Sequence, residues 1–576
     1  MGSINHKSDI SSVETMQDIA RSWNFQMTPK EAEQYLATTE AAQASVDLVD
    51  AMPDYIDPRL KPDLGLDETS RKYTEALEKE NPLNAWIFRT HLEASTPTSK
   101  YGLLAGKTIA VKDTVSIAGV PMTCGTQPFH LSRDSPYPVP VIDAPIVSRV
   151  LAAGATVTGT STCENYCLSA MSCTSATGPV ENPWAPGYSA GGSSSGSAAL
   201  VAVDGVRRWR GARGLSVGDL GQGADFAVGG DQGGSIRVPA AYCGIYGMKP
   251  THGLVPYTGL SQFLPLIDHA GPMAASVRDN ALLLSVLAGY DGFDPRMTPE
   301  TPLRENVPQY HELLDRAIAS RTEAGTWTPG AAGTGLRIGV LKEAFEVPGM
   351  DPTVASVIRD AASRFEGLGA SVREASVPLH AQAPHIFTAA TRASLPASFT
   401  AQAAPPTLSH PFPGPPVPRP DQAWFDAVTR SNPLVAVALL SGEALSGRHP
   451  ESVRHKALRH VHGLRAAYDA ALRDCDVLVM PATPTAAVRH AGEDMGVLEK
   501  AGFLLSNTVN TMPFNVTGHP GFVMPVGWVK SDGDGEGGVS LPVGMQIVGR
   551  RWREMDVYLA AAAWEVGGLG LDENFS

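Results

Sequence analysis

The chain alternates short apolar runs with amphipathic segments from about residue 103 onward. Residues 107–111 (KTIAV) predict a strand, and residues 144–153 (APIVSRVLAA) predict a helix that leads into a second strand at 155–160. We expect Asp143, directly before that helix, to cap it. This order of elements is typical of a strand–helix–strand unit.

A similar unit recurs in the second half of the chain. Residues 336–341 predict a strand, Asp351-Pro352 predicts a helix start, and apolar positions spaced by three and four mark one helix face up to Phe365. Further apolar strands are predicted at 477–480 and 543–548. The alternation predicts an α/β protein, with a single large α/β/α domain whose mixed central sheet is covered by helices.

Two parts of the chain depart from that pattern. Residues 1–75 are polar and helical in character, with a capping box at Thr28–Glu31, and are predicted to form an N-terminal helical extension to a main domain at 76–572. Packing or oligomerisation, such as formation of a homodimer, is the expected role of the extension. Residues 404–420 hold eight prolines and predict a stiff surface excursion.

Composition narrows the class of protein. The chain has 576 residues, 43% of them hydrophobic, which is enough for a large core, and its formal charge of −14 argues against a nucleic-acid-binding surface. Six cysteines in this length predict a reducing compartment. No apolar run is long enough to span a bilayer, and the first residues, MGSINHKSDISS, lack the apolar stretch of a secretory signal. We expect a cytoplasmic protein of enzyme size with no nucleic-acid or membrane partner.

The strongest chemical signal is a glycine-rich turn that ends in Ser235. Residues 224–228 (ADFAV) predict a strand, and the sequence GGDQGG follows at its end. Because glycines leave backbone amides uncovered, the N–H groups of Gln232, Gly233 and Gly234 would converge on one oxygen and stabilise an oxyanion. The plainer interpretation is an ordinary glycine-rich turn.

Charged residues and a second serine cluster lie close to this turn in the sequence. Asp231 and Arg237 flank it and would hold its shape through charge-assisted hydrogen bonds. The cluster that begins at Ser193 matches GxSxG, the nucleophile elbow of serine esterases, with Ser194 as nucleophile. That motif requires a strand directly before it, and the proline-containing residues 182–190 do not predict a central strand. An esterase that uses Ser194 is therefore the weaker alternative.

A serine nucleophile needs a base, and the sequence offers few candidates. His252, His269 and His519 lie near glycines in turn contexts, and none sits in a catalytic motif. Lys112 stands at the end of the strand at 107–111, where a lysine is most often a solvated charge. Burial beside hydroxyls rather than carboxylates would favour the neutral amine that a base requires. Lys112 is therefore a candidate base only if the fold buries it.

These segments together resemble the amidase signature family. The match runs in the same order over roughly residues 75–570, and its motifs are Lys112-Asp113, NPW at Asn182, GGSS from Gly191, GGSIR up to Arg237, CGIYGMKPT at Cys243, GPM at Gly271, PATPT at Pro481, PFNVTGHP at Pro513 and LPVGMQIVGR at Leu541. Within the family, GDQGGS and IDHAGPM most resemble the aliphatic and aryl amidases found with nitrile hydratases.

The resemblance implies a Ser–cis-Ser–Lys triad, in which Ser235 is the nucleophile, Ser193 the bridging serine at a cis peptide and Lys112 the base. It also implies hydrolysis of the carbon–nitrogen bond of a small-molecule linear amide, an oxyanion hole made by the three amides before Ser235, and no cofactor or metal. An amidotransferase-type subunit that needs partners, or a non-catalytic paralogue, remains an alternative.

The spacing of the two serines departs from the family pattern. Ser193 and Ser235 are 42 positions apart, farther than in the family, and the excess falls near residues 204–223, with four arginines at 207–213. One interpretation is a surface loop, and the other is a short retained intron translated in frame. A spliced transcript that encodes residues 207–213 would exclude the intron.

Two further sets of residues are open to more than one interpretation. Cys163 and Cys167 lie four apart, with Cys173 following and no histidine beside them, which favours a packing or pocket-lining role over metal binding. Four aromatic residues near the proline-rich segment would line an acyl pocket or pack in a core or lid: Phe387, Phe399, Trp424 and Phe425.

Overall fold

The computed structural model describes residues 12–62, 71–94, 102–132, 136–400, 418–492, 494–531 and 539–566. Contacts divide the chain into two units, Met1–Arg59 and Leu60–Ser576, which are described separately. The sequence placed this boundary near residue 75. In the structure, β1 (Tyr73–Glu75) already pairs antiparallel with β2 (Trp86–Leu92) in the larger unit.

The smaller unit consists of two helices that pack against each other, α1 (Val13–Ser22) and α2 (Pro29–Asp50). The capping box predicted at the start of α2 is confirmed. Thr28 Oγ1 accepts a hydrogen bond from the Glu31 amide, and the Glu31 carboxylate accepts one from the Thr28 amide at 2.8 Å. These bonds satisfy amides that have no partner within the helix.

The larger unit is built on a mixed sheet of twelve strands, in the order β1-β2-β4-β3-β7-β9-β8-β13-β14-β12-β10-β11. The remaining strands of this sheet are β3 (Thr108–Lys112), β4 (Thr156–Ser161), β7 (Phe226–Asp231), β8 (Tyr246–Lys249), β9 (His269–Ala274), β10 (Arg337–Leu341), β11 (Ser371–Ala375), β12 (Val477–Pro481), β13 (Gly521–Lys530) and β14 (Ser540–Gly549). Strand β3 is parallel to both β4 and β7, and β10 is parallel to both β11 and β12, whereas the other pairs are antiparallel. Strands β5 (Glu181–Asn182) and β6 (Ala185–Ser189) form a separate two-stranded sheet.

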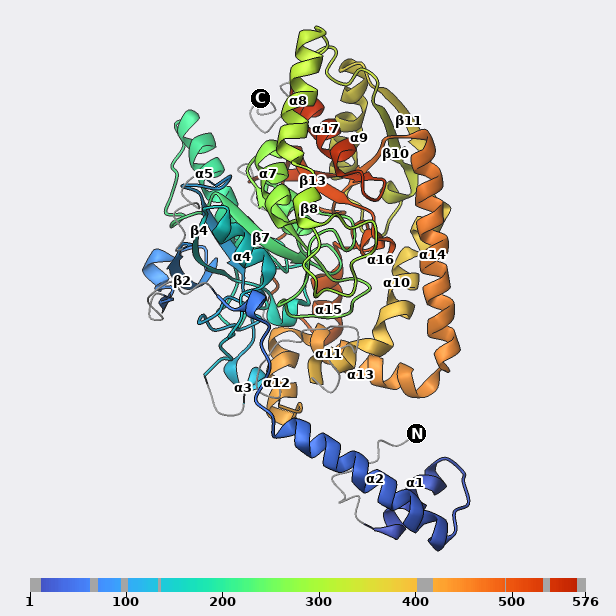
Figure 1. Cartoon of the computed structure of the whole chain (residues 1–576). Helices are drawn as coiled ribbons and strands as arrows, with labels where there is room; N and C mark the ends of the chain where they lie inside the picture. Colours follow the sequence, from blue (N-terminus) through green and yellow to red (C-terminus); the bar gives the residue numbers. More distant parts are fainter. Residues whose placement is uncertain are drawn as a thin grey trace. The chain divides into compact units, whose positions relative to one another are not determined.

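Helices surround this sheet (Figure 1). They are α3 (Pro128–Leu131), α4 (Pro145–Ala152), α5 (Ser195–Ala212), α6 (Arg237–Cys243), α7 (Val277–Leu287), α8 (Tyr310–Glu323), α9 (Pro352–Gly367), α10 (Ala383–Thr391), α11 (Leu395–Thr400), α12 (Gln422–Ser431), α13 (Pro433–Arg448), α14 (Glu451–Asp474), α15 (Val497–Leu505), α16 (Pro513–Thr517) and α17 (Glu554–Val566).

Two glycines of β14 show that helices cover both faces of the sheet. A Cβ on Gly544 would meet Ala241 of α6, and one on Gly549 would meet Val557 of α17. Residues an odd number apart point to opposite faces of a strand, so α6 and α17 lie on opposite sides. The predicted α/β/α architecture with a mixed sheet is therefore confirmed.

The prediction for Asp143 is wrong. Helix α4 begins after Ala144 and has no side-chain cap. The Asp143 carboxylate instead accepts the Ala118 amide at 2.9 Å and forms a buried ion pair with Arg71 at 2.7 Å. A buried carboxylate requires a charged partner, and the guanidinium satisfies that requirement better than the helix amides would.

The atypical segment at 204–223 is packed within the larger unit. Its first part continues α5 as far as Ala212, and a loop then returns to β7. The Trp209 ring stacks edge-on against Trp184 with centroids 5.4 Å apart, and Arg210 donates a hydrogen bond to the Trp184 carbonyl at 2.7 Å. These contacts tie the segment to the loop that precedes Ser193.

Two further sequence predictions concern the proline-rich stretch and membrane-spanning segments. Most of the proline-rich stretch at 404–420 lies outside the described residues, as the structure describes only its last three. A search of the described helices for one long and apolar enough to cross a membrane finds none.

Candidate active site

The site lies where two parallel strands end side by side. Strand β3 ends at Lys112 and β7 ends at Asp231, with Val111 opposite Val228 in the register. Because both strands run in the same direction, the residues after them meet at one edge of the sheet. The glycine-rich turn and the candidate base are brought together by this pairing.

Lys112 and Ser193 form a buried pair. The Lys112 side-chain nitrogen lies 2.8 Å from Ser193 Oγ and 3.4 Å from the Gly230 carbonyl, and both side chains are completely buried. The Gly192–Ser193 peptide bond is cis. Within the described chain, no carboxylate lies within ion-pair distance of Lys112, so its surroundings are hydroxyl and carbonyl groups.

Ser235 faces an open cavity beside this pair. The residue is 8% exposed and lines a cavity of about 90 Å³. Its carbonyl accepts the Ser194 amide at 3.1 Å, which ties the two serine segments together. The Ser235 hydroxyl is not hydrogen-bonded to Ser193 in this structure, so two of the three predicted catalytic side chains are in contact and the third is adjacent.

The glycine-rich turn is held by a buried ion pair. Asp231 and Arg237 are both fully buried, with two N–H···O bonds of 2.9 Å between the guanidinium and the carboxylate. Burial alone would raise the pKa of Asp231, but the Arg237 charge and its hydrogen bonds, with one from Asn515, hold it at about 2. Asp231 is therefore a carboxylate near neutral pH, and the predicted supporting pair is present.

The Gly234 amide, one of the three predicted oxyanion donors, already has a hydrogen-bond acceptor within the turn. The Gly234 amide donates to the Asp231 carboxylate at 2.8 Å, and the Ile236 amide donates to the same group at 3.1 Å. This hydrogen bond of the Gly234 amide helps to hold the turn in shape. Of the three predicted amides, those of Gln232 and Gly233 therefore remain as candidate oxyanion donors. The sequence could not show this, because the direction of the Asp231 side chain depends on Arg237.

Several supporting residues come from parts of the chain far from the turn. Arg237 donates to the Thr511 carbonyl and to Gln546 Oε1, each at 2.7 Å, and to Asn515 Oδ1 at 2.8 Å. Sequence reasoning assigned no role to these three residues. Asn515 and Gln546 lie within the motifs PFNVTGHP and LPVGMQIVGR, which are the signal that could have found them.

Two side chains fix the surroundings of the serines. Ser194 Oγ donates to the Gly230 carbonyl at 3.1 Å, so Ser194 joins the start of α5 to the end of β7. The Gln232 side-chain amide donates to the Tyr257 hydroxyl, which in turn donates to the Ser261 carbonyl at 2.9 Å. Because Tyr257 uses its only proton on Ser261, the Gln232 amide group is the donor to it.

The walls of the cavity at Ser235 are mostly apolar. They include Leu168, Phe263, Ile267, Phe387, Leu395, Leu505 and Met512, together with Cys167 and the turn at Gln232 and Gly233. Of the four aromatic residues considered from sequence, Phe387 lines this cavity, Phe399 and Trp424 are buried in a core cluster, and Phe425 is 38% exposed. The pocket-lining role expected for Cys167 is confirmed.

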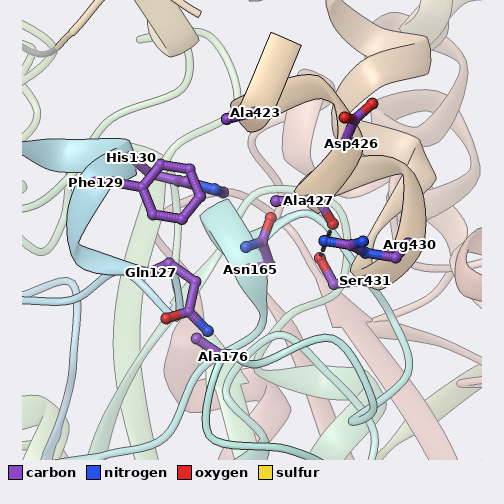
Figure 2. A pocket seen from close by; sticks show the side chains of 10 residues that line it. All are labelled: Gln127, Phe129, His130, Asn165, Ala176, Ala423, Asp426, Ala427, Arg430 and Ser431. Atoms are coloured by element: carbon purple, nitrogen blue, oxygen red, sulfur yellow. Dashed lines mark hydrogen bonds between the residues drawn. The ribbon is translucent and has the colours of Figure 1, made fainter. Parts of the chain in front are cut away.

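A larger cavity of about 650 Å³ is lined by Asn165, which lies in the same short turn, Asn165–Cys167, as the Cys167 of the smaller cavity. Figure 2 shows Asn165 between Phe129 and His130 on one side and Arg430 of α12 on the other. His130 is buried, and its burial lowers its pKa to about 4, so the ring is neutral near pH 7. None of the predicted catalytic residues lines this cavity, and the smaller cavity at Ser235 is therefore the candidate active site.

The three histidines considered from the sequence bond to backbone carbonyls or to a carboxylate, and not to Ser193 or Ser235. His269 Nδ1 is within hydrogen-bond distance of the Ile267 carbonyl, His252 of the Pro265 carbonyl, and His519 of the Asp469 carboxylate. None of the three lines the cavity at Ser235. Within the described ranges, no group of three or more His, Cys, Asp or Glu side chains is arranged to hold a metal ion.

Comparison with known proteins finds amidases and amidotransferase subunits among the proteins similar to this chain. The family profile described as amidase matches residues 70–208 and 221–558, and so passes over 209–220 within the atypical segment. An enantioselective amidase of Rhodococcus rhodochrous is 35% identical over 509 residues, which cover 86% of this chain and 85% of that protein. A glutamyl-tRNA(Gln) amidotransferase subunit of Methanosarcina barkeri is 32% identical, over 81% of this chain and 85% of its own length. The crystal structure of a peptide amidase from Stenotrophomonas maltophilia superposes with a TM-score of 0.58 at 25% identity, covering 85% of this chain and 90% of that one.

Proposed function

Because this chain belongs to the amidase signature family, we propose that it hydrolyses a small carboxylic acid amide through an acyl-enzyme on Ser235. The products are the acid and ammonia or an amine. The observation that carries the proposal is the buried contact between Lys112 and Ser193, 2.8 Å long, beside a serine that opens into an apolar cavity. A nucleophile next to a base that is itself held in place is the arrangement that acyl transfer requires.

Acylation uses these residues in order. Lys112, as the neutral amine, takes the Ser193 proton, and Ser193 takes the proton of Ser235 as that oxygen attacks the amide carbon. The Ser235 hydroxyl turns toward Ser193 when substrate binds, since catalytic hydrogen bonds often tighten only in the complex. The amides of Gln232 and Gly233 stabilise the oxyanion, and Ser193 returns a proton to the departing nitrogen.

Deacylation reverses the relay. A water molecule takes the place of the leaving amine, gives its proton to Ser193, and attacks the acyl carbon. The tetrahedral intermediate uses the same oxyanion donors, and Ser235 leaves as the hydroxyl after receiving the proton. The Asp231–Arg237 pair has no proton-transfer role, because it faces the back of the turn and keeps the donors aligned.

The cavity favours a compact apolar acyl group. Its volume of about 90 Å³ is smaller than the ~150 Å³ cavity that holds benzene in a well-studied case. Its walls are aliphatic and aromatic, with Phe387 as the largest contributor from the helices outside the sheet. We therefore propose short, branched aliphatic amides as better substrates than amides of charged or large aromatic acids.

A second candidate is an amidotransferase-type subunit. Relatives named as glutamyl-tRNA(Gln) amidotransferase subunits are 30–33% identical over most of this chain, which favours it. Such a subunit works with partner proteins. Amide hydrolysis by the purified chain alone would argue against this candidate.

The test is ammonia release from a panel of aliphatic, aryl and amino-acid amides by the purified chain, with Ser235→Ala as control. We expect release that favours isobutyramide and similar amides and disappears in the variant. Release that persists in Ser235→Ala at the wild-type rate would refute the acyl-enzyme assignment. A release that requires Ser194 instead would favour the serine-esterase alternative.

A further inference from the structure

The larger cavity, which the proposed mechanism does not use, is lined by polar side chains that lack hydrogen-bond partners. Both ring nitrogens of His130 and Oδ1 of Asn165 are buried without a partner among the described residues. Each of these two residues is 2% exposed, and both line the cavity. Because a buried polar group without a partner destabilises the fold, such a group marks a place where water or a ligand binds.

Two more buried oxygens without partners belong to the segment that ends α12. They are Thr429 Oγ1, one residue before Arg430, and Asn432 Oδ1. The other side-chain atom of Asn432, Nδ2, donates to the Asn165 carbonyl at 3.1 Å and to the Leu168 carbonyl at 3.0 Å. The end of α12 is therefore fixed against the turn that carries Asn165, and atoms without partners lie on both of these elements.

Aromatic rings hold His130 in place where hydrogen bonds do not. The His130 ring stacks on the Tyr166 ring with centroids 5.7 Å apart, and the Phe129 ring meets it edge-on at 4.5 Å. The neutral imidazole offers one acceptor nitrogen and one N–H donor. Phe129 also lines the cavity and is 45% exposed, so an apolar surface lies next to the unpartnered polar atoms.

One positive and one negative side chain of α12 line the same cavity, Arg430 and Asp426. They are one helical turn apart, yet the Arg430 guanidinium forms no ion pair with any residue that the structure describes, and the Asp426 carboxylate accepts the Gln422 side-chain amide at 2.8 Å. Figure 2 shows the side chains of Arg430 and Asn165 pointing toward each other across the cavity. Because Asp426 repels an anion, the cavity suits a neutral ligand better than a carboxylate.

We propose that the larger cavity is a second binding site, which takes a neutral primary amide. The two N–H groups of the ligand donate to Asn165 Oδ1 and to the acceptor nitrogen of His130. The ligand carbonyl accepts a hydrogen bond from Arg430, and the acyl group lies against the Phe129 ring. A primary carboxamide carries two donors and one acceptor on neighbouring atoms and has no charge, so it matches these groups together.

The size of the cavity sets which amides this site accepts. Its volume of about 650 Å³ lies within the roughly 300–1,000 Å³ of ordinary ligand sites. A benzene ring needs about 150 Å³, which exceeds the 90 Å³ of the cavity at Ser235. An aromatic amide therefore fits the second site and not the cavity at Ser235, so it serves as a selective probe.

The second site adjoins the cavity at Ser235 through one turn. Asn165 lines the larger cavity and Cys167 lines the smaller one, and both belong to the turn Asn165–Cys167. Tyr166 and Cys167 have φ of 50° and 57°, a conformation that side chains rarely adopt. A ligand bonded to Asn165 stabilises this turn, and with it the wall of the smaller cavity, so we expect it to lower KM for a small amide about fivefold. This consequence rests on the proposed function, whereas the binding itself does not.

The experiment titrates the purified full chain carrying Ser235→Ala, in which the proposed hydrolysis is blocked, with 4-fluorobenzamide and follows binding by fluorine NMR. We expect the amide to bind about tenfold more tightly than 4-fluorobenzoate, which has no N–H group and carries a charge. His130→Phe keeps the ring contacts and removes the nitrogens, and Arg430→Met removes the cation. Each should weaken amide binding about tenfold, whereas Arg448→Met, at an exposed arginine of α13 outside the cavity, should leave it unchanged.

Crystals soaked with 4-bromobenzamide locate the ligand by the anomalous signal of bromine. A signal between Phe129 and Arg430 would support the proposal. Ordered water alone in that space, a signal only at Ser235, equal affinity for amide and acid, or unchanged amide affinity in Arg430→Met would overturn it.

The effect on hydrolysis is measured separately, as KM for isobutyramide with and without 4-fluorobenzamide. We expect KM to fall in the wild-type chain and not in Arg430→Met. An unchanged KM in a chain that binds the probe would overturn the coupling between the cavities. Because binding is measured in the Ser235→Ala chain, a failure of the proposed function is distinguishable from a failure of this inference.

Discussion

Replacing Asp231 with asparagine tests the role of the buried ion pair most sharply. The substitution keeps the shape of the side chain, removes its charge, and leaves the fully buried Arg237 without its counterion. Breaking a buried pair by removing one partner costs about 3–5 kcal/mol. The amides of Gly234 and Ile236 also lose a carboxylate acceptor, so we expect the turn that carries the oxyanion donors to lose its alignment.

The pH dependence of the free energy of unfolding gives a second estimate of what the Asp231–Arg237 pair contributes to stability. The pKa of Asp231 is about 2 in the folded chain, below its unfolded value of about 3.9, so its contribution to stability is present above pH 4 and is lost as the pH falls toward 2. That contribution is about 3 kcal/mol at neutral pH, and about half of it remains at pH 3. The difference in free energy of unfolding between wild type and Asp231→Asn should therefore narrow between pH 5 and pH 3.

The assay is urea unfolding followed by tryptophan fluorescence at several pH values, with amide hydrolysis measured on the folded protein. Asp143→Asn is the matched control, because Asp143 forms another buried pair, with Arg71, and takes no part in the turn. Burial raises the pKa of Asp143, so the stability gap of this variant should not narrow on acidification, and its kcat should stay near the wild-type value. A stability gap for Asp231→Asn that is unchanged from pH 7 to pH 3, or a kcat equal to that of wild type, would refute the reasoning.

Three further substitutions test separate parts of the mechanism and the fold. In Gly234→Ala the new Cβ would lie 2.3 Å from Thr511 Oγ1 on a backbone with φ of +143°, and we expect kcat/KM to fall about a hundredfold or more, as when an oxyanion donor is lost. Phe387→Ala widens the cavity, so the ratio of kcat/KM for a bulky acyl amide to that for isobutyramide should rise about tenfold, and an unchanged ratio would exclude Phe387 from the acyl pocket. Trp209→Ala removes a half-buried ring from the contacts with Trp184 and should lower the free energy of unfolding by about 2 kcal/mol, while a change near zero in urea unfolding would show that the atypical segment is not anchored.

The fold followed from the sequence wherever periodicity was clear. Strands such as β3 and β10 were predicted because short apolar runs end at polar residues, and the helix that begins after Asp351 was predicted because its cap and apolar face agree. The prediction that Asp143 caps a helix was wrong because the carboxylate pairs with Arg71, which is 72 positions away in the sequence. Local patterns carry no information about such a partner.

The candidate site was predicted only where it depends on local sequence, and not where it depends on distant partners. The order of strand, glycine-rich turn and serine is local, and it placed Ser235 and its amides, but the commitment of the Gly234 amide to Asp231 depends on Arg237 and Asn515. The place of Cys167 in the wall of the cavity at Ser235 depends on a backbone turn at positive φ that no residue type there predicts. Tertiary hydrogen bonds of this kind are visible only once the chain is folded.

The measurement that tests the central claim most directly is labelling of the purified chain with a fluorophosphonate, followed by peptide mapping. The oxygen of an activated serine attacks the phosphorus of this reagent and displaces fluoride, which leaves a stable phosphonate ester, as an amide substrate would leave an acyl ester. We expect one label, on Ser235, that appears together with the loss of amide hydrolysis and is absent in Lys112→Ala. A label on Ser194 or Ser193 instead, or full amide hydrolysis by a chain labelled on Ser235, would contradict the assignment of Ser235 as the nucleophile.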